Sequence, residues 1–317
     1  MTVLILAAEF DVTADQMVLA LRERDVPVCR IDTSWFPSQL SFKAELRDDR
    51  WCGCLCAPGR DVELAGLRSV WYRSPTTFQF PSELSSAERQ HAFLEAKYGL
   101  GGVLSSLPVL WVNHPARAAA ASKPVQLSTA ARCGLTVADT LITNEPSAVR
   151  RFAQRGATVT KMLSANHIAE EGTRKITLTR LLDDEDLADL RGIEATCHLM
   201  QRWAPKQHEA RVIAIGKQLF AFAIHAGNAP SYIDFRADYD ALSYEPIELP
   251  IDVTNGIRRF LDTMGLVYGA LDFVVGPDAS YTFLECNSGG QFGWLEARTG
   301  APLTQVLADL LAQGTRP

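Results

Sequence analysis

Two aliphatic runs separated by an amphipathic segment open the chain. Thr2 to Ala8 is aliphatic, Ala14 to Arg24 carries its apolar residues at helical spacing, and Val26 to Ile31 is apolar again. A strand without polar alternation is buried on both faces, as are the strands of parallel sheets that are joined by helical crossovers. The order strand, helix, strand therefore predicts a β-α-β unit and an α/β domain at the N-terminus.

Further apolar segments extend this domain over residues 1–115. Trp51 to Ala57, Ser69 to Tyr72 and Leu107 to Val112 are expected to add strands to a mostly parallel sheet. This region lacks a G-x-G-x-x-G turn, so no dinucleotide is expected there. A chain of 317 residues is long enough for more than one core, which favours further domains.

Residues 116–204 predict a compact α+β lobe. A helix rich in Ala and Gln is expected from Ala116 to Gly134, because glycine commonly follows the last helical residue. A second helix is expected from Ser147 to Gln154. The expected strands are Leu141 to Thr143, Ala157 to Met162, Arg174 to Leu178 and Cys197 to Trp203.

Residues 205–317 predict an antiparallel sheet. Two helices, at about Thr254 to Met264 and Leu303 to Ala312, are expected to pack against this sheet. Its expected strands are Glu209 to Ile215, Gln218 to His225, Leu271 to Val275 and Tyr281 to Glu285.

Composition excludes several classes of protein. Hydrophobic residues make up 47% and charged residues 21% of the chain, as in ordinary globular proteins. The net charge of -6 provides no overall positive field, so neither nucleic acid nor a membrane is expected as a partner. The sequence shows neither a signal peptide nor an apolar run of the roughly 20 residues that a membrane span needs. A cytoplasmic enzyme is the expectation.

Cysteine usage fits the same compartment. Seven cysteines without paired metal spacing favour reduced thiols over a disulfide framework. Cys52, Cys54 and Cys56 form a cluster on one face of a strand, and packing is favoured there over metal binding because no histidine lies nearby in sequence.

The most informative segment is the pair of apolar runs that contains Asp272 and Glu285. A hairpin with its turn near Pro277 would bring Asp272 close to Glu285 and Asn287. Carboxylate and amide oxygens are the ligands that Mg²⁺ prefers, and carboxylates in apolar strands are costly without a compensating cation. The alternative is a solvated acid at each strand end, which is favoured for any one of these residues alone but not for the set.

Two lysines are candidates for phosphate binding. Lys123 lies at an Ala-rich helix start, and Lys161 ends a short apolar strand. Lysine binds phosphate as a compact charge, although a plain surface lysine is the alternative and fits Lys123 better than Lys161. The polar, glycine-containing stretch from Ser164 to Thr173 is expected to form a mobile lid over the phosphates.

An apolar strand that runs into Pro205 has the character of an interdomain hinge, whose backbone can bind the edge of adenine. Glu209 and Arg211 lie two residues apart and share one face of the next strand. Arg236 offers a second arginine to stabilise the anionic groups of a phosphoryl transfer. Salt-bridged surface arginines are the alternative for both.

These residues occur in motifs that resemble those of ATP-grasp enzymes, and more narrowly of the graspetide synthetases, which crosslink ribosomally made peptides. The resemblance covers nearly the whole chain. Asn113 to Leu127 matches the helix that carries their first phosphate lysine. The remaining matches are Val70 to Pro75 with V-W-Y-R-R-P, Glu209 to Gly216 with E-x-R-V-x-x-x-G, Asp234 to Arg236 with D-W-R, and Glu285 to Glu296 with E-x-N-P-N-G-Q-W-G-W-[IL]-E.

The resemblance implies an ATP-grasp fold with three parts: residues 1–115 as the pre-ATP-grasp domain, 116–204 as the central subdomain and 205–317 as the C-terminal subdomain. ATP would lie between the last two. The implied roles are phosphate binding by Lys123 and Lys161, contact with adenine by Gln201 and the Trp203 backbone, nucleotide binding by Glu209, Mg²⁺ binding by Asp272, Glu285 and Asn287, and charge stabilisation at the γ-phosphate by Arg211 and Arg236.

The implied reaction is phosphorylation of an Asp or Glu side chain of a precursor peptide, followed by attack of a Ser or Thr hydroxyl or a Lys amine. The product is a macrocycle with ester or amide links. The precursor's leader would dock on the central subdomain, and a homodimer is a further possibility, since relatives commonly form one.

The chain departs from the motifs at several positions without losing a phosphate or metal ligand. The departures are Ser74 in place of the second arginine, Phe235 and Phe292 in place of tryptophans, and Ser288 and Gly289 in place of Pro-Asn. They are expected to change how the peptide is positioned rather than to abolish activity.

Two other functions remain open at this point. A ligase that adds a free amino acid to a peptide or protein C-terminus would use the same nucleotide site. A non-catalytic nucleotide-binding or peptide-binding module would have no physical need to keep anionic magnesium ligands.

Overall fold

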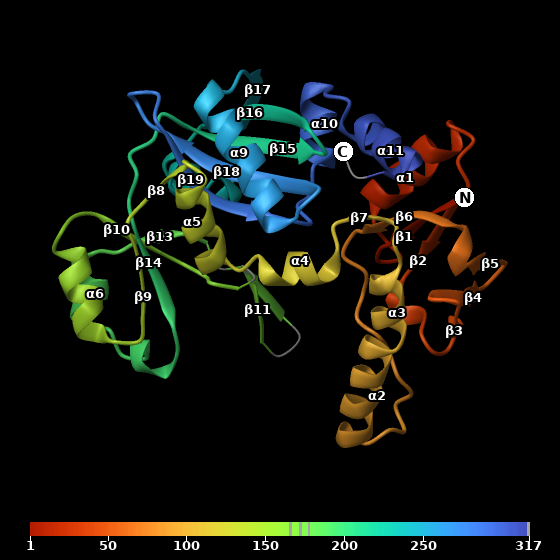
Figure 1. Cartoon of the computed structure of the whole chain (residues 1–317). Helices are drawn as coiled ribbons and strands as arrows, with labels where there is room; N and C mark the ends of the chain where they lie inside the picture. The colour runs from red at the N-terminus through yellow and green to blue at the C-terminus, as the bar shows by residue number, and fades with distance from the viewer. Residues whose placement is uncertain (165–166, 171–172, 177, 316–317) are drawn as a thin grey trace.

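The structure is a computed structural model that describes residues 1–164, 167–170, 173–176 and 178–315. Figure 1 shows an N-terminal domain in red and orange, a central lobe in green and a large sheet in green-blue and blue. The short yellow helix α4 (Pro115–Ala120) bridges the N-terminal domain and the rest of the chain. This mixed α/β architecture confirms the expected fold class.

A four-stranded parallel sheet organises the N-terminal domain, as the opening β-α-β pattern predicts. Its order is β2-β1-β6-β7, formed by β1 (Thr2–Leu6), β2 (Val28–Ile31), β6 (Leu67–Tyr72) and β7 (Leu110–Val112). Helix α1 (Val12–Arg22) makes the first crossover and begins at Asp11, whose side chain accepts a hydrogen bond from the Ala14 N–H. Such an N-cap satisfies a backbone donor that the helix leaves free.

The strand expected from Trp51 to Ala57 forms, but it pairs outside the parallel sheet. It is β4 (Arg50–Ala57), the middle strand of a separate antiparallel sheet with β3 (Ser41–Arg47) and β5 (Arg60–Glu63). Tight turns on both sides of β4 bring its sequence neighbours alongside, which commits both of its edges. Cys54 is buried on this strand and Cys52 and Cys56 are half-buried.

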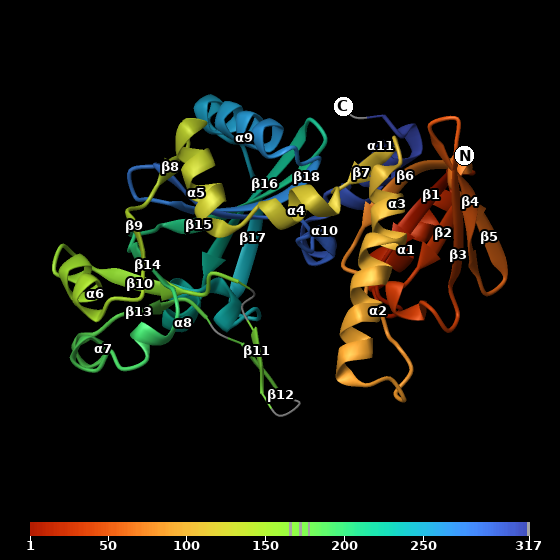
Figure 2. The same ribbon diagram turned by 60° about the horizontal axis from the view of Figure 1, so that its bottom comes forward.

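Two helices follow β6 that the sequence analysis did not identify. Helix α2 (Ser86–Tyr98) begins with a capping box formed by Ser85 and Glu88, and α3 (Leu100–Ser106) follows directly. Figure 1 and Figure 2 both show α2 extending away from the parallel sheet. Ala96 is the buried residue of α2, so this helix has no apolar stripe by which the sequence would have revealed it.

The single helix expected from Ala116 to Gly134 is wrong, because the chain forms two helices there. Helix α5 (Lys123–Arg132) starts anew after α4 ends at Ala120. Pro124 explains the break: it lacks an N–H and is tolerated only in the first turn of a helix. The restart places Lys123 at the first position of α5, and Gly134 adopts a positive φ of 83° beyond its end.

The central lobe is a four-stranded antiparallel sheet in the order β13-β10-β14-β9. A small core that includes Val149, Phe152 and Met200 joins the sheet to its helices. A hairpin of β11 (His167–Glu170) and β12 (Thr173–Ile176) projects from the lobe (Figure 2). The remaining elements are β9 (Thr140–Thr143), α6 (Pro146–Ala153), β10 (Thr158–Lys161), β13 (Arg180–Leu181), α7 (Asp184–Ala188) and β14 (His198–Arg202).

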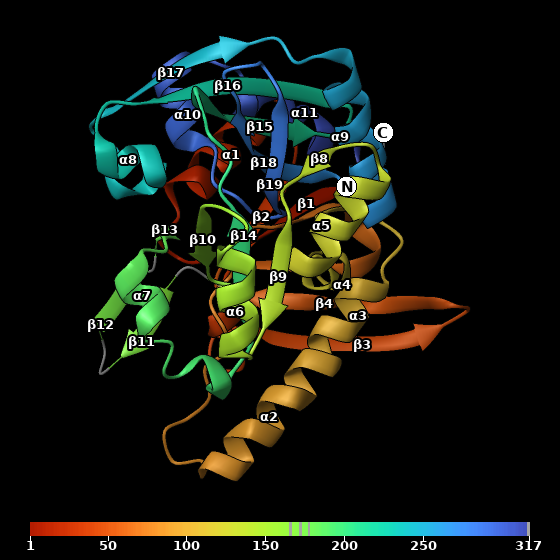
Figure 3. The same cartoon turned by 90° about the vertical axis from the view of Figure 1, so that its left-hand side faces the viewer.

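The third part is a six-stranded sheet in the order β17-β16-β15-β18-β19-β8, antiparallel except for the short β8. Its strands are β8 (Thr136–Val137), β15 (His208–Ile215), β16 (Gln218–Ala226), β17 (Leu242–Ile247), β18 (Tyr268–Val275) and β19 (Tyr281–Asn287). Figure 3 shows these strands above the central lobe. The associated helices are α8 (Ala229–Ile233), α9 (Ile251–Met264), α10 (Gly293–Thr299) and α11 (Leu303–Gln313).

Helices cover both faces of this sheet. Helices α5 and α9 pack on one face, in a core that contains Phe260, Phe273 and Phe283. Helix α11 packs against this sheet at β15, as expected, but its main neighbours are α1 and β6 of the N-terminal domain. Leu303, Leu307 and most other apolar side chains of α11 are buried in a core that contains residues of both β1 and β15.

A buried asparagine fastens the N-terminal domain to the third part. The Asn113 side-chain amide donates to the carbonyls of Tyr268 and Ser288 at 2.7 Å each. Its carbonyl oxygen accepts from the N–H groups of Val267 and Tyr268, at 2.7 and 3.0 Å. All four hydrogen-bonding positions of one side chain are thus used. Within the described ranges, no helix is long and apolar enough to cross a membrane.

Candidate active site

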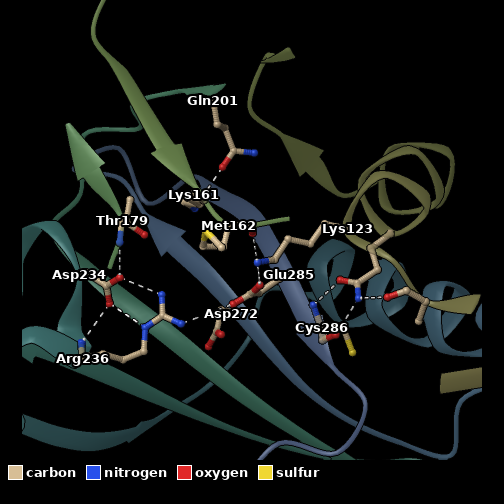
Figure 4. Close-up of polar contacts among 12 residues, drawn as sticks. Lys123, Lys161, Met162, Thr179, Gln201, Asp234, Arg236, Asp272, Glu285 and Cys286 are labelled. Carbon is tan, nitrogen blue, oxygen red and sulfur yellow. Dashed lines mark hydrogen bonds and ion pairs between the residues drawn. The ribbon is translucent and has the colours of Figure 1, made fainter. Parts of the chain in front are cut away.

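A pocket lies between the central lobe and the six-stranded sheet, and most of the expected site residues line it. Figure 4 shows side chains from the two lysine-bearing elements, β10 and α5, converging on the carboxylates of β18 and β19. The expected site residues on its walls are Lys123, Lys161, Gln201, Trp203, Glu209, Arg236, Asp272 and Glu285. Arg211 and Asn287 are not among the lining residues.

Asp272 and Glu285 face each other across the hairpin that the sequence predicts. They are register partners on β18 and β19, with a bulge directly after Asp272. Asp272 also pairs in register with Arg211 on β15, whose Nη1 donates to both carboxylate oxygens at 2.7 Å. Burial is the largest influence on the Asp272 carboxyl and raises its pKa, while the Arg211 guanidinium opposes that rise.

Glu285 is surrounded by cations. Lys123 Nζ lies 3.2 Å from one carboxylate oxygen and Arg236 Nη1 lies 3.9 Å from the other. Burial alone would raise the pKa of Glu285, but Lys123, Arg236 and Lys161 together bring it below its usual value. The carboxylate is therefore ionised at neutral pH.

The two lysines approach the pocket from different elements. Lys123 donates to the Met162 carbonyl at 2.6 Å, so α5 and the end of β10 are held together at the pocket. Lys161 donates to the side-chain oxygen of Gln201 at 3.1 Å. Burial lowers the pKa of Lys161, and the carboxylates of Glu285 and Glu209 oppose that decrease. Within the described residues the bonding partner of Lys161 is neutral, so this cation can gain stability from an anionic ligand.

The segment after β14 brings backbone groups of Trp203 and Ala204 to the wall of the pocket. The Trp203 N–H donates to the Ala157 carbonyl at 2.9 Å, and within the described residues its carbonyl accepts no hydrogen bond. Gln201 donates to the Thr140 hydroxyl at 3.0 Å, and this bond fixes its oxygen toward Lys161.

Lys206 is a site residue that the sequence analysis missed. It is buried, forms an ion pair with Glu209, and lies 5.8 Å from the ring of Trp203 and 5.4 Å from the ring of Tyr232. Burial raises the pKa of Glu209, and Lys206 opposes that rise. The position of Lys206, three residues before Glu209, was the available signal, but its burial depends on Tyr232 of a distant helix.

Asp234 orients Arg236 in the pocket. Its two carboxylate oxygens accept from Nε and Nη2 of Arg236 at 2.8 Å each, and one also accepts from the Thr179 N–H at 2.8 Å. Burial would raise the pKa of Asp234, but the hydrogen bonds from Arg236 outweigh burial and bring this pKa to about 2. The third nitrogen, Nη1, is the one directed at Glu285 (Figure 4).

Asn287 is the expected ligand that the structure does not bring into this pocket. It lies two residues beyond Glu285, is exposed, and its side-chain oxygen accepts from the Gly289 N–H at 3.0 Å. The described ranges contain no group of three or more His, Cys, Asp or Glu side chains that could hold a metal ion. A magnesium site here would therefore rest on Asp272 and Glu285, with phosphate oxygens completing the coordination.

Gln126 holds α5 in place against strand β19. The Gln126 amide donates to the Cys286 carbonyl at 2.9 Å and accepts from the Cys286 N–H at 2.7 Å. It also donates to the Ala121 carbonyl at 2.6 Å. Cys286 lies between the expected ligands Glu285 and Asn287, so Gln126 sets the distance between Lys123 and these residues.

Two of the motif departures lie against each other. A side chain built at Gly289 would come within 3.8 Å of the Ser74 hydroxyl, so small residues meet where the N-terminal domain faces the loop after β19. Phe292 is buried in the core shared by the two domains, and Phe235 is buried beside Leu242. Residues 165, 166, 171 and 172 of the expected lid lie outside the described residues.

The chain is similar to known proteins in both sequence and structure. Residues 2–119 match the family model described as the MvdD pre-ATP grasp domain. No curated protein sequence matches the chain. Among solved structures, the chain is similar to a RiPP-associated ATP-grasp ligase from Chryseobacterium gregarium in complex with ADP and a leader and core peptide, with 26% identity, a TM-score of 0.90, and coverage of 100% of this chain and 99% of that one.

Two further structures come from Microcystis aeruginosa MRC. The macrocyclase MdnC, bound with the precursor peptide MdnA, is 28% identical with a TM-score of 0.86, and the match covers 98% of this chain and 99% of MdnC. The macrocyclase MdnB is 27% identical with a TM-score of 0.80, and 98% of each chain is covered. The similarity extends over the N-terminal domain, the central lobe and the sheet that carries the site. The protein is an ATP-dependent ligase of the ATP-grasp type, and over nearly its whole length it is similar to a RiPP-associated ligase and two macrocyclases.

Proposed function

We propose that this ligase crosslinks a ribosomally made precursor peptide into a macrocycle, with ATP as the source of activation. The observation that carries the proposal is the pocket between two sheets, where cationic side chains that include Lys123 and Lys161 meet the facing carboxylates of Asp272 and Glu285. Relatives with peptides in their structures support the choice of substrate: the Chryseobacterium enzyme holds a leader and core peptide, and MdnC holds its precursor MdnA.

The residues fit a magnesium nucleotide. Lys123 and Lys161 place two ammonium groups on one side of the pocket, where the phosphates would lie, and the Trp203 carbonyl is available to adenine. Asp272 and Glu285 offer hard oxygen ligands opposite these lysines. When bound, Mg²⁺ would neutralise charge on the phosphates that react. Asn287 would join the metal only if its bond to Gly289 were released.

The reaction proceeds in two transfers. A carboxylate oxygen of the peptide attacks the γ-phosphorus, the bond to the β-phosphate oxygen breaks, and ADP leaves. A hydroxyl or amine of the same peptide then attacks the acyl carbon, phosphate leaves with the electrons of the broken C–O bond, and the nucleophile loses its proton to solvent or phosphate. Arg236, held by Asp234, and Arg211, held by Asp272, direct positive charge toward the groups on which negative charge develops.

Mass spectrometry of a co-expressed precursor tests this proposal. The precursor is sought as a short reading frame beside the gene, with repeated Thr or Ser and Asp or Glu in its C-terminal half. Each crosslink releases water and lowers the peptide mass by about 18 Da, whereas addition of a free amino acid raises it. A mass increase would favour the amino-acid ligase, and an unchanged mass without ADP release would favour a non-catalytic binding module.

A further inference from the structure

We propose that Arg73 binds the side-chain carboxylate of the peptide before it is phosphorylated. The proposal rests on the proposed function, because it names where the acceptor carboxylate is held. Arg73 is 4% exposed and does not line the nucleotide pocket, so none of the roles described above accounts for it.

The position of Arg73 is one where α/β domains commonly bind ligands. It follows β6 directly, and Asp11 follows the neighbouring strand β1. In the order β2-β1-β6-β7, the chain leaves β1 toward β2 and later returns on the other side at β6, so the sheet reverses its winding between β1 and β6. Crevices at the carboxyl ends of strands at such a point are the usual ligand sites of open parallel sheets.

One edge of the Arg73 guanidinium is free of hydrogen bonds. Nη1 donates to the Gly289 carbonyl at 3.2 Å, but Nε and Nη2 are buried and have no hydrogen-bond acceptor in the described part of the chain. The Nε and Nη2 groups form the planar fork that binds carboxylates through two parallel hydrogen bonds. Arg236 provides the comparison, because there the same two nitrogens each donate to Asp234 at 2.8 Å.

The nearest resident carboxylate does not fill this fork. Asp11 Oδ2 lies 3.5 Å from Arg73 Nε, which is beyond the usual length of such a bond. The other oxygen of Asp11 accepts from the Ala14 N–H at 3.0 Å and caps helix α1. Asp11 therefore cannot present both oxygens to Arg73 without giving up the cap, and buried donors without acceptors are costly.

The fork lies next to the residues that carry the chemistry. Gly289 accepts from Arg73, and the following residue, Gly290, has no room for a side chain, since a Cβ there would come within 3.1 Å of Arg211 Nη2. Tyr268 donates to the Gly290 carbonyl at 2.6 Å. The segment Gly289–Gly290 thus lies between Arg73 and the ion pair formed by Arg211 and Asp272.

Exposed residues surround the position of Arg73. Ser74, which follows Arg73, is exposed, as are Asn287 and Gln291 on either side of the two glycines. Nε and Nη2 themselves are buried, so the proposed carboxylate reaches them only if one of these exposed neighbours moves aside. A flexible peptide side chain that ends in a carboxylate can supply both acceptors that the fork lacks.

Calorimetric titration of the full chain, saturated with ADP and Mg²⁺, tests the assignment. The probe is N-acetylglutamate α-amide, and its neutral isostere N-acetylglutamine α-amide is the ligand control. We expect the glutamate probe to bind the wild type and the Arg73→Gln variant to bind it at least about tenfold more weakly, since a charge-assisted bidentate contact is lost. Arg258→Gln, which removes an exposed arginine on α9, is the matched control and should bind like the wild type.

Three results would overturn the assignment: wild-type affinity in Arg73→Gln, equal affinity of the wild type for the glutamine probe, or no binding of the glutamate probe. If Arg73→Gln does not fold, Arg73→Lys serves instead, because it keeps the charge and loses the fork. That variant is expected to bind at least about threefold more weakly, and wild-type affinity would refute the proposal. Titration of ADP alone, and the mass of the co-expressed precursor, test the proposed function separately from these results.

Discussion

Replacing Gln126 by leucine removes the side chain that holds α5 against strand β19. β8 pairs with β19 only at Thr282 and Phe283, so at Cys286 the Gln126 amide supplies both hydrogen bonds that a neighbouring strand would otherwise provide. A third bond ties the same amide to the Ala121 carbonyl. Gln126→Leu keeps the approximate size of the side chain and leaves these three backbone groups without partners.

The expected loss of stability follows from that count. A buried polar group left without a partner costs about 1 kcal/mol or more, so three of them lower the free energy of unfolding by about 3 kcal/mol. Domains of this kind commonly have stabilities of about 5–15 kcal/mol, so the variant still folds. Because Lys123 starts α5 and lies 3.2 Å from Glu285, the variant should also bind ADP more weakly.

Urea denaturation followed by circular dichroism measures the first effect, and titration with ADP and Mg²⁺ measures the second. Gln305→Leu is the matched control, because this glutamine is exposed on α11 and should be replaceable at a cost below about 0.5 kcal/mol. A free energy of unfolding for Gln126→Leu within about 0.5 kcal/mol of the wild type would refute the reasoning.

Three further predictions concern the pocket and the domain contact. Glu285→Gln should lower precursor-dependent ADP release by more than about tenfold without unfolding the chain, because the variant loses a charged oxygen ligand for the metal. Wild-type turnover in a coupled ADP assay would contradict the site assignment. The ionised Asp234 stabilises the fold above its unfolded pKa of 3.8, and this stability is lost as the pH falls through its folded pKa of about 2. Urea denaturation should therefore show that the wild type is more stable than Asp234→Asn at pH 5, and that this difference is about 2 kcal/mol smaller at pH 2. Asn113→Ala leaves four hydrogen-bonding groups of the third part without partners and should lower the free energy of unfolding by about 3 to 4 kcal/mol. A loss below about 1 kcal/mol in urea denaturation would contradict the described contact between the domains.

Local patterns predicted the elements better than the contacts between them. The pairing of Asp272 with Glu285 follows from two apolar runs around one short turn, so the hairpin could be foreseen. The break between α4 and α5 was also present in the sequence, since Pro124 is compatible only with a first helical turn. Lys206 and Gln126 could not be assigned in this way, because each is defined by a partner that lies far away along the chain.

The position of Asn287 shows a different limit. Period-two spacing places it on the same face of β19 as Glu285, and the sequence analysis treated the two as equivalent ligands. The strand ends there, and the side chain turns to accept from the Gly289 N–H. Spacing along a strand gives the face of a residue, but it does not show whether the last residue keeps its side chain over the sheet.

The core that α11 shares with β1 and β15 determines which part of the molecule can move. A continuous apolar interior joins the N-terminal domain to the six-stranded sheet, and separating the two parts would expose Leu303, Leu307 and their neighbours to water. The central lobe has its own small core and contributes Lys161 and Gln201 to the pocket from outside that interior. A displacement of the central lobe would therefore change the pocket from one side, since it would carry Lys161 and Gln201 while Asp272 and Glu285 stay with the six-stranded sheet.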